Sequence, residues 1–588
     1  MANMYTVNRA PLASDWNTRR PDGYDVVVIG SGYGGAITAA RIASAQWPDP
    51  KPTICILERG KEWLPGQFPD NLLDGAPQVR SDLSPLGLYD FHIGADIGVI
   101  KGSGLGGTSL VNANVAYQPD DDLFDNPQWP QAIRDARDSG KLQEYFDRVR
   151  ATLFADRHPH GMDLSKVKAL KKGADGRPNS EFDLLNIAVN FTFEGRNNWG
   201  VQQRKCINCG DCITGCNVGA KNTLDTNYLA IAKSGGAGIF TQVEVNRVEK
   251  DPAGGYLIHY VRRDNDGGVT QQGTLKAKRT VILSAGALGS TAIMLRSREQ
   301  GLGLPNTVGT RFSGNGDFFG LAYNSDARTD VLGWGAYPDS DRARRIQPAP
   351  GQTLYPGPTI VARIRYRKDK PLQKRITIED LSFPLMYVDA ARAAFAVMIG
   401  RDTDSDDFFD SLEETGRRLL DVGAFNPELE KGALNYTMLY LVMGYDDAGG
   451  RIELDANTGQ AAIRWPGVGG QGVFQRENDL LLEHATALGA DFIENPIWGF
   501  TPARTLFTAH PLGGCPMGED QTTGLVNDSG QVFDEHGIPH DGLYIADGSI
   551  IPTAIGVNPF LTISALSERI AESVTTSLGG TPVVVTSL

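Results

Sequence analysis

The sequence lacks the features that would place the protein in a membrane or on a nucleic acid. It has no apolar run long enough to cross a bilayer. Basic residues are outnumbered, since 56 Lys and Arg stand against 70 Asp and Glu, for a net charge of −14. We therefore expect no transmembrane segment and no nucleic-acid partner.

We also expect no secretory leader. Arg19 and Arg20 form a twin-arginine pair, but neither an apolar stretch nor a small-residue cleavage site follows them. We therefore expect a cytoplasmic protein. The 41% hydrophobic and 21% charged residues are typical of a globular chain, and 588 residues predict two or more domains.

Cysteine is scarce, and its placement says more than its number. Four of the six cysteines crowd into eleven residues, namely Cys206, Cys209, Cys212 and Cys216. Without a leader, such crowding favours metal or cluster binding over disulfides. The spacing is that of a bacterial ferredoxin segment, with Asn217 replacing the usual proline. It predicts an iron–sulfur cluster, either 4Fe–4S or 3Fe–4S, with structural zinc, disulfides or free thiols as the alternatives.

The N-terminal region carries a dinucleotide fingerprint between two buried-strand patterns, at 25–29 and 54–57. Its glycines permit a tight turn, a close approach to a pyrophosphate, and packing of the following helix on the strand. An acidic residue after the second strand is placed to bind ribose hydroxyls. The motif does not separate NAD from FAD. The predicted binding residues are Gly30, Gly32, Tyr33, Gly34, Gly35 and Glu58.

Further segments follow in a recognisable order, at 30–41, 102–112, 222–229, 284–296, 314–316, 510–515, 542–549 and 556–560. With these segments the chain resembles the glucose–methanol–choline (GMC) oxidoreductase family. It is most similar to the branch that contains the non-covalent bacterial cholesterol oxidases. The resemblance covers nearly the whole length, and it implies that the cofactor is FAD.

The resemblance also implies a fold of class α/β plus α+β. A discontinuous Rossmann-type FAD-binding domain would comprise 21–130, 218–322 and 500–588. Alternating strand patterns with helices predict an antiparallel-sheet substrate domain, comprising 131–204 and 323–499. The cysteine segment, 205–217, would lie between these parts.

Further flavin contacts are implied by the same resemblance. The loop at 102–115 would lie along the isoalloxazine ring, and Val243 would bond the adenine through its backbone. Pro559 would begin a last helix whose N-terminus points at the flavin pyrimidine. No histidine stands in the loop at 102–115, so we expect non-covalent FAD. The implied contacts are Gly102, Gly106, Gly107, Asn112, Val243, Asp547, Gly548, Asn558 and Pro559.

The matching segments imply two catalytic residues. His510 would be the base, for which a neutral imidazole is suited, and Asn558 would bond the substrate oxygen. We expect an FAD-dependent alcohol dehydrogenase that oxidises a small-molecule alcohol to a carbonyl by hydride transfer to flavin N5, with a mild preference for a hydrophobic cyclic alcohol. Leu434 stands in place of the glutamate with which cholesterol oxidase isomerises the steroid, which makes a sterol substrate and the isomerase step doubtful.

The fate of the electrons depends on the cysteines. Some relatives, the bacterial FAD glucose dehydrogenases, hold an iron–sulfur cluster at the corresponding place, with a different cysteine spacing. A cluster beside the flavin would pass electrons singly to an acceptor protein or quinone. The first alternative is an oxygen-dependent alcohol or sterol oxidase with zinc or no metal at the cysteines. The second is a non-redox flavoprotein.

Overall fold

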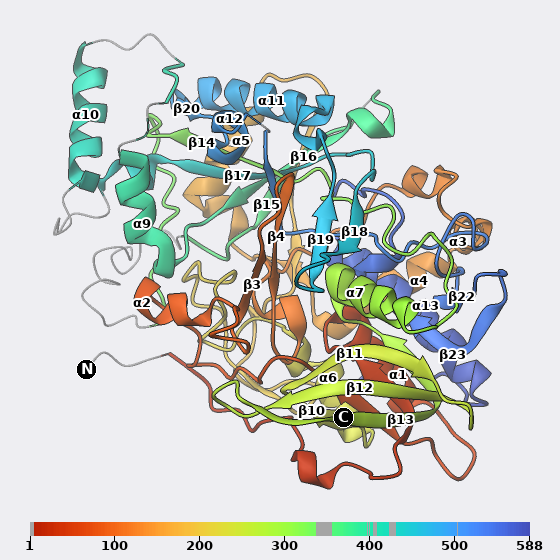
Figure 1. Cartoon of the computed structure of the whole chain (residues 1–588). Coiled ribbons are helices and arrows are strands. Elements are labelled where there is room, and N and C mark those ends of the chain that lie inside the picture. Colours follow the sequence, from red (N-terminus) through yellow and green to blue (C-terminus); the bar gives the residue numbers. More distant parts are fainter. Residues whose placement is uncertain are drawn as a thin grey trace.

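The computed structural model describes residues 5–336, 356–422 and 431–588, except 368, 397, 399, 404–407 and 503. Two sheets organise these residues, one in the lower half of Figure 1 and one in the upper half, with the β3–β4 hairpin between them. The α/β plus α+β class is confirmed. No helix in the described ranges is long and apolar enough to span a bilayer.

The first sheet has a parallel core in the order β10-β2-β1-β13-β23. Its strands are fully buried where they pair, as expected of a parallel sheet covered on both faces. Strands β11 and β12 extend the other part of β13 as an antiparallel meander. The bounds are β1 (Tyr24–Ile29), β2 (Ile54–Leu57), β10 (Gly238–Phe240), β11 (Val243–Lys250), β12 (Tyr256–Arg263), β13 (Val269–Leu283), β22 (Gln531–Phe533) and β23 (Pro539–Ile545).

Helix α1 (Tyr33–Ser44) packs on this sheet and against α6 (Tyr228–Ser234) and α13 (Phe560–Ser577). Two glycines make this packing possible. A Cβ on Gly34 would lie 1.4 Å from the Ala546 carbonyl oxygen, and one on Gly35 would lie 2.1 Å from that of Gly30. The start of α1 is thereby held directly over the carboxyl ends of the strands.

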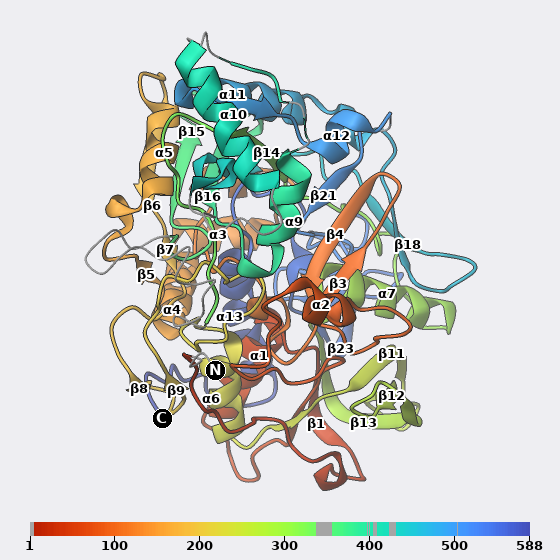
Figure 2. The same cartoon turned by 90° about the vertical axis from the view of Figure 1, so that its left-hand side faces the viewer.

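The second sheet is antiparallel, in the order β20-β14-β17-β16-β15-β6. Helices α5 (Ser165–Ala174) and α11 (Gly472–Leu488) cover one of its faces (Figure 2). The opposite face is turned toward the C-terminal loop of the first part, since Thr377 bonds to the Gly556 carbonyl. The strands are β6 (Ser180–Leu184), β14 (Phe318–Tyr323), β15 (Ala362–Tyr366), β16 (Ile376–Leu381), β17 (Met438–Met443) and β20 (Asp491–Ile493).

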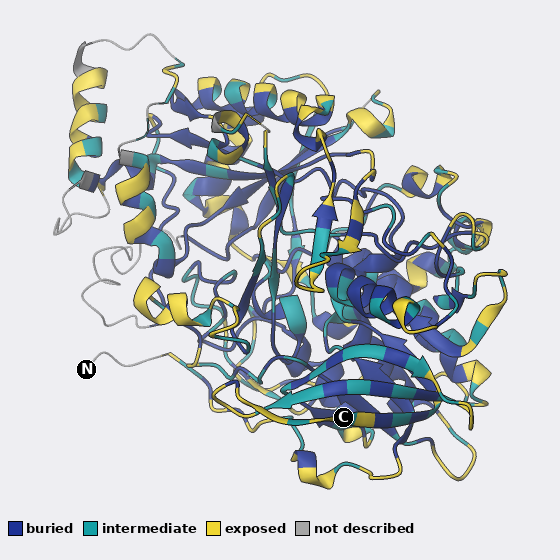
Figure 3. Cartoon of the chain, viewed as in Figure 1, coloured by how far each residue is buried: buried dark blue, intermediate teal, exposed yellow. Residues whose placement is uncertain are grey.

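Smaller elements complete the fold. Strand β4 pairs with β3 and with β21. The outer helices α9 and α10 pack beside the second sheet. Most residues of α10 are exposed (Figure 3). The bounds are α2 (Leu72–Gly75), β3 (Tyr89–His92), β4 (Ile97–Gly102), β5 (Asp156–Arg157), β7 (Asn186–Ile187), β8 (Gly195–Arg196), β9 (Gln202–Gln203), α7 (Gly286–Glu299), α9 (Leu385–Ala396), α10 (Phe408–Val422), β18 (Arg451–Leu454), β19 (Ala461–Arg464), α12 (Pro496–Phe500) and β21 (Leu506–Thr508).

One predicted boundary differs from the structure. We assigned 131–204 to the substrate part, but α3 (Gln131–Asp138) and α4 (Lys141–Leu153) pack on the first part, where α4 contacts α13. The physical reason is the apolar stripe of α4, which includes Tyr145 and Phe146 and is buried in the core around the parallel sheet. Only α5 and β6 of this segment join the second sheet.

Candidate active site

His510 follows strand β21 and is held by a buried carboxylate. Its Nδ1 lies 2.7 Å from Oδ1 of Asp317, whose side chain is fully buried, while the imidazole keeps 13% exposure. The second oxygen of Asp317 accepts hydrogen bonds from the Thr508 hydroxyl and the Ala509 amide. In the neutral imidazole this contact places the proton on Nδ1, which leaves Nε2 as the acceptor.

Asn558 lies in a loop fixed by Asn315. The Asn315 side chain accepts hydrogen bonds from the Ile555 and Gly556 amides and donates to the Val557 carbonyl. Because Asp317 is two residues further along, one short segment positions both predicted catalytic residues. The catalytic roles of His510 and Asn558 stay predictions.

Two residues in contact with the predicted catalytic pair escaped the sequence analysis. Asp317 directly follows the 314–316 segment and could have been found there, because catalytic histidines are often oriented by a carboxylate. Glu379, in β16, accepts a hydrogen bond from Asn558 Nδ2 over 3.0 Å. No local signal pointed to Glu379, because only the register of β16 brings it to Asn558.

The structure brings the two predicted glycine segments together. Gly106 and Gly107 have φ of 103° and 56°, and a Cβ on Gly107 would lie 2.9 Å from the Gly32 Cα. A Cβ on Gly32 would meet no described atom within 4 Å, and no side chain caps α1 there. Open space and uncapped amides at a helix start fit a pyrophosphate.

Tyr33 and Asn112 extend this cradle. Asn112 Nδ2 donates to the Tyr33 hydroxyl over 2.7 Å, and the Tyr33 ring stacks on Phe560 at the start of α13. Oδ1 of Asn112 is buried and finds no hydrogen-bond partner in the described ranges. A cofactor with polar edges would satisfy that atom, so the residues here fit the flavin end of FAD.

Other predicted FAD residues lie at the carboxyl ends of the parallel strands. The Glu58 carboxylate accepts hydrogen bonds from Ser31 and from the Gly60 amide, and burial raises the pKa of its carboxyl. The Asp547 carboxylate is bonded by Gly286, Ser290 and Ser549, and its pKa is also raised by burial.

The remaining predicted FAD-binding positions differ in which of their atoms are available to a ligand. The Val243 amide donates to the Glu58 carbonyl, so only other atoms of Val243 are left for an adenine. Gly548 begins a short 3-10 helix, and Pro559 comes one residue before α13. Gly102 ends β4, and Gly30 turns with φ of 96° after β1. As FAD contacts, all these residues stay predictions.

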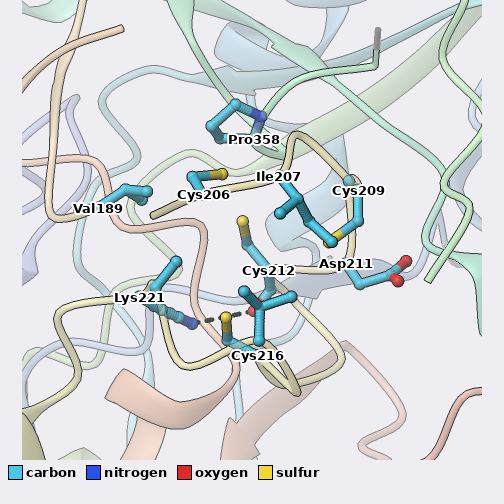
Figure 4. A pocket seen from close by; sticks show the side chains of 12 residues that line it. Val189, Cys206, Ile207, Cys209, Asp211, Cys212, Cys216, Lys221 and Pro358 are labelled. Carbon is cyan, nitrogen blue, oxygen red and sulfur yellow. Dashed lines mark hydrogen bonds between the residues drawn. The ribbon is translucent and has the colours of Figure 1, made fainter. Parts of the chain in front are cut away.

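The four clustered cysteines line one cavity, which Lys221 also lines (Figure 4). The sulfur atoms of Cys206, Cys212 and Cys216 are directed into a common space, and Cys209 reaches it beside Ile207. Burial raises the pKa of the Cys206 thiol, and the neighbouring Cys212 and Cys216 raise it further. Among the described side chains, however, no three His, Cys, Asp or Glu are close enough to hold one metal ion. The cluster therefore stays a proposal.

Lys221 joins this cavity to the flavin loop. Its buried ammonium donates to the carbonyl oxygens of Leu110, Asn112 and Cys212, over 3.1, 2.6 and 2.9 Å. Two of these carbonyls belong to the loop predicted to lie along the flavin ring. The third belongs to the cysteine segment, so the two loops are in direct contact through one side chain.

Two family models match the chain, both described as GMC oxidoreductase, over residues 25–314 and 480–567. A cholesterol oxidase of Mycobacterium tuberculosis is 26% identical, over 94% of this chain and 91% of that protein. One from Acinetobacter baumannii is 25% identical, with 93% of each covered. A long-chain-alcohol oxidase of Arabidopsis thaliana is 22% identical, over 94% of this chain and 67% of that protein.

Solved structures agree with the fold. Pyridoxine 4-oxidase from Mesorbium loti superposes with a TM-score of 0.56 at 16% identity, covering 93% of this chain and 98% of the other. A fungal aryl-alcohol oxidase superposes with a TM-score of 0.55 at 15% identity, covering 95% of this chain and all of the other.

Proposed function

The chain belongs to the GMC oxidoreductase family, and on that premise we propose that it is an FAD-dependent dehydrogenase of an apolar alcohol, with an iron–sulfur cluster at Cys206, Cys209, Cys212 and Cys216 as the exit for electrons. The observation that carries the catalytic part is the His510–Asp317 pair, in which a buried carboxylate orients a histidine that keeps 13% exposure.

The residues divide the chemistry between them. Bound FAD supplies the acceptor for the hydride that leaves the carbinol carbon. His510 Nε2 takes the hydroxyl proton, and Asp317 stabilises the imidazolium that forms. Asn558, whose Nδ2 gives one hydrogen to Glu379, donates the other to the substrate oxygen.

An apolar substrate is supported by the side chains between the loop at 113–117 and the second sheet. They form a hydrophobic cluster on the sheet face that carries Glu379, and several keep partial exposure, as a binding surface requires. The cluster includes Ala113, Val115, Tyr117, Phe319, Leu381, Leu439 and Leu441. Cys206 packs against the same cluster, so substrate and cysteine cavity would be neighbours.

The electron exit is supported by the contact through Lys221, because the cysteine segment touches the flavin loop directly. The cluster, when bound, would take the two electrons one at a time. In the second candidate function, molecular oxygen takes both electrons. The names of the sequence relatives favour it, since they are cholesterol oxidases and long-chain-alcohol oxidases.

One experiment separates the two functions. Protein purified without oxygen is reduced by an alcohol series that includes 1-dodecanol and cholesterol, and then mixed with oxygen or with a quinone. The proposal expects iron and sulfide in the protein, with fast flavin reoxidation by the quinone and slow reoxidation by oxygen. Iron-free protein with fast reoxidation by oxygen would establish the oxidase.

A further inference from the structure

Strand β15 carries a buried arginine, Arg363, on the sheet face that looks toward the predicted active site. Side chains alternate along a strand, and Tyr366 of β15 contacts His484 of α11 on the helix-covered face. Arg363 therefore points to the other face, where it stands directly across from Glu379 of β16. With 9% exposure, it is a buried charge beside the proposed substrate site.

The contacts of its guanidinium leave one end open. The group lies over the ring of Tyr117, 4.4 Å from the ring centre, and Tyr117 belongs to the apolar cluster described above. Nη1 is buried and finds no hydrogen-bond partner among the residues that the structure describes. Nη2 is 4.0 Å from Oδ2 of Asp183, an oxygen that already accepts a hydrogen bond from Arg157 over 2.8 Å. The ring face attracts the cation but gives its N–H groups no oxygen.

The neighbouring arginines are paired much more closely. Arg365 donates to both carboxylate oxygens of Asp120 over 2.8 Å. Arg367 donates to Asp120 and to Glu181, also over 2.8 Å. Burial of a charge without such partners costs free energy, and burial lowers the pKa of the Arg363 guanidinium. A ligand that supplies the missing acceptor would explain this cost.

Glu379 does not fill that place. It stands across from Arg363, but its Oε2 accepts a hydrogen bond from Asn558. Burial raises the pKa of the Glu379 carboxyl to about 8, so at neutral pH the group is mostly uncharged. The positive charge of Arg363 is therefore available to an anion that enters the site.

We propose that Arg363 binds a carboxylate of the substrate, so that the alcohol oxidised here has an apolar body and carries an acidic group away from its hydroxyl. The N–H groups of a guanidinium match the two oxygens of a carboxylate. One positive charge also matches a carboxylate better than a phosphate, which carries about −1.5 to −2 at neutral pH. The inference rests on the proposed function for the oxidation step, and it adds a subsite for the substrate.

The register of the sheet relates this subsite to the hydroxyl. Residues directly across an antiparallel ladder have Cα atoms about 4.5–5.5 Å apart. Since Glu379 contacts Asn558, the carboxylate would bind about one strand away from the residue that holds Asn558. A straight-chain acid with a terminal hydroxyl can reach both places, and a series of chain lengths finds the spacing that fits.

The test compares the wild type with Arg363→Gln, Arg363→Lys and a control, Arg367→Gln, all loaded with FAD. Gln removes the charge and Lys keeps it, whereas Arg367 is already neutralised by two carboxylates. Binding of butanoate, octanoate and dodecanoate is measured by titration calorimetry, which needs no reaction. Anaerobic flavin reduction is measured with 4-hydroxybutanoate, 8-hydroxyoctanoate and 12-hydroxydodecanoate, each against the 1-alkanol of equal length. Melting temperatures check folding, and loss of an unpaired buried charge should not lower them.

We expect the carboxylate that binds the wild type best to bind Arg363→Gln at least tenfold more weakly, Arg363→Lys to be intermediate, and Arg367→Gln to match the wild type. The hydroxy acid of that length should reduce wild-type flavin at lower concentrations than its alkanol, and Arg363→Gln should lose only this preference. Equal carboxylate binding by the wild type and Arg363→Gln, or equal slowing with acid and alkanol, would overturn the inference. Carboxylate binding that depends on Arg363, in a protein whose flavin no alcohol reduces, would refute the proposed function alone.

Discussion

Asp317→Asn is the substitution with the most sharply defined outcome. The carboxylate is fully buried and accepts three hydrogen bonds, from His510, Thr508 and Ala509. Asn has the same shape but must place an NH2 group where one oxygen was. If the NH2 faces His510, the imidazole proton moves to Nε2 and the base is lost. If it faces Ala509, two donors oppose each other in a buried site, which costs about 1–3 kcal/mol.

The expected size follows from the first case. An Asp to Asn change behind a catalytic histidine lowers rates by about 10⁴ in the serine-protease triad. We expect flavin reduction by alcohol to slow by about 10³–10⁴, or about 4–5.5 kcal/mol of barrier at about 1.36 kcal/mol per tenfold. The assay is anaerobic stopped-flow bleaching of the flavin absorbance, with Glu477→Gln as the control for loss of a nearby buried carboxyl. Reduction within tenfold of the wild-type rate would refute the assignment of Asp317 and His510.

Three further predictions concern the base, the cysteines and stability. His510→Gln should retain FAD, seen in its absorbance spectrum, and lose flavin reduction by at least 10³-fold; fast reduction would exclude His510 as base. Cys206→Ser and Cys212→Ser should lower iron content while FAD stays bound, and Cys55→Ser, a buried cysteine of β2, should keep wild-type iron; equal iron in all three would contradict the cysteine site. Glu379 has a raised pKa, so the folded protein binds a proton more readily than the unfolded chain, and its burial costs stability progressively from about pH 4.5 to about pH 8. Glu379→Gln should therefore gain in melting temperature over the wild type across that window, and a gain that does not grow with pH would show that the carboxyl is already ionised in the fold.

Much of the fold could be predicted because its signals are local. The apolar run of β1, the glycines after it and the acid after β2 all lie between Tyr24 and Glu58, and they specify the start of a parallel sheet with a helix over it. The assignment of α4 was wrong because an amphipathic stripe indicates that one face of a helix is buried, but it does not indicate which core that face joins.

The active site was predictable only in part, for a related reason. His510 and Asn558 stand in distinctive segments, and Asp317 follows one directly. Glu379 is separated from Asn558 by 179 residues and occupies an ordinary strand position. Its contact with Asn558 follows from the register of β16 against β15 and β17, which no short sequence pattern contains.

The path of the electrons can be followed during one turnover. Protein purified without oxygen is mixed with an alcohol that bleaches its flavin, frozen at successive times, and examined by EPR and visible absorption. We predict an iron–sulfur signal that changes with the same alcohol dependence as the flavin, and that is missing in Cys206→Ser. A flavin that is reduced by the alcohol in a protein without iron, and that oxygen reoxidises rapidly, would contradict the dehydrogenase account.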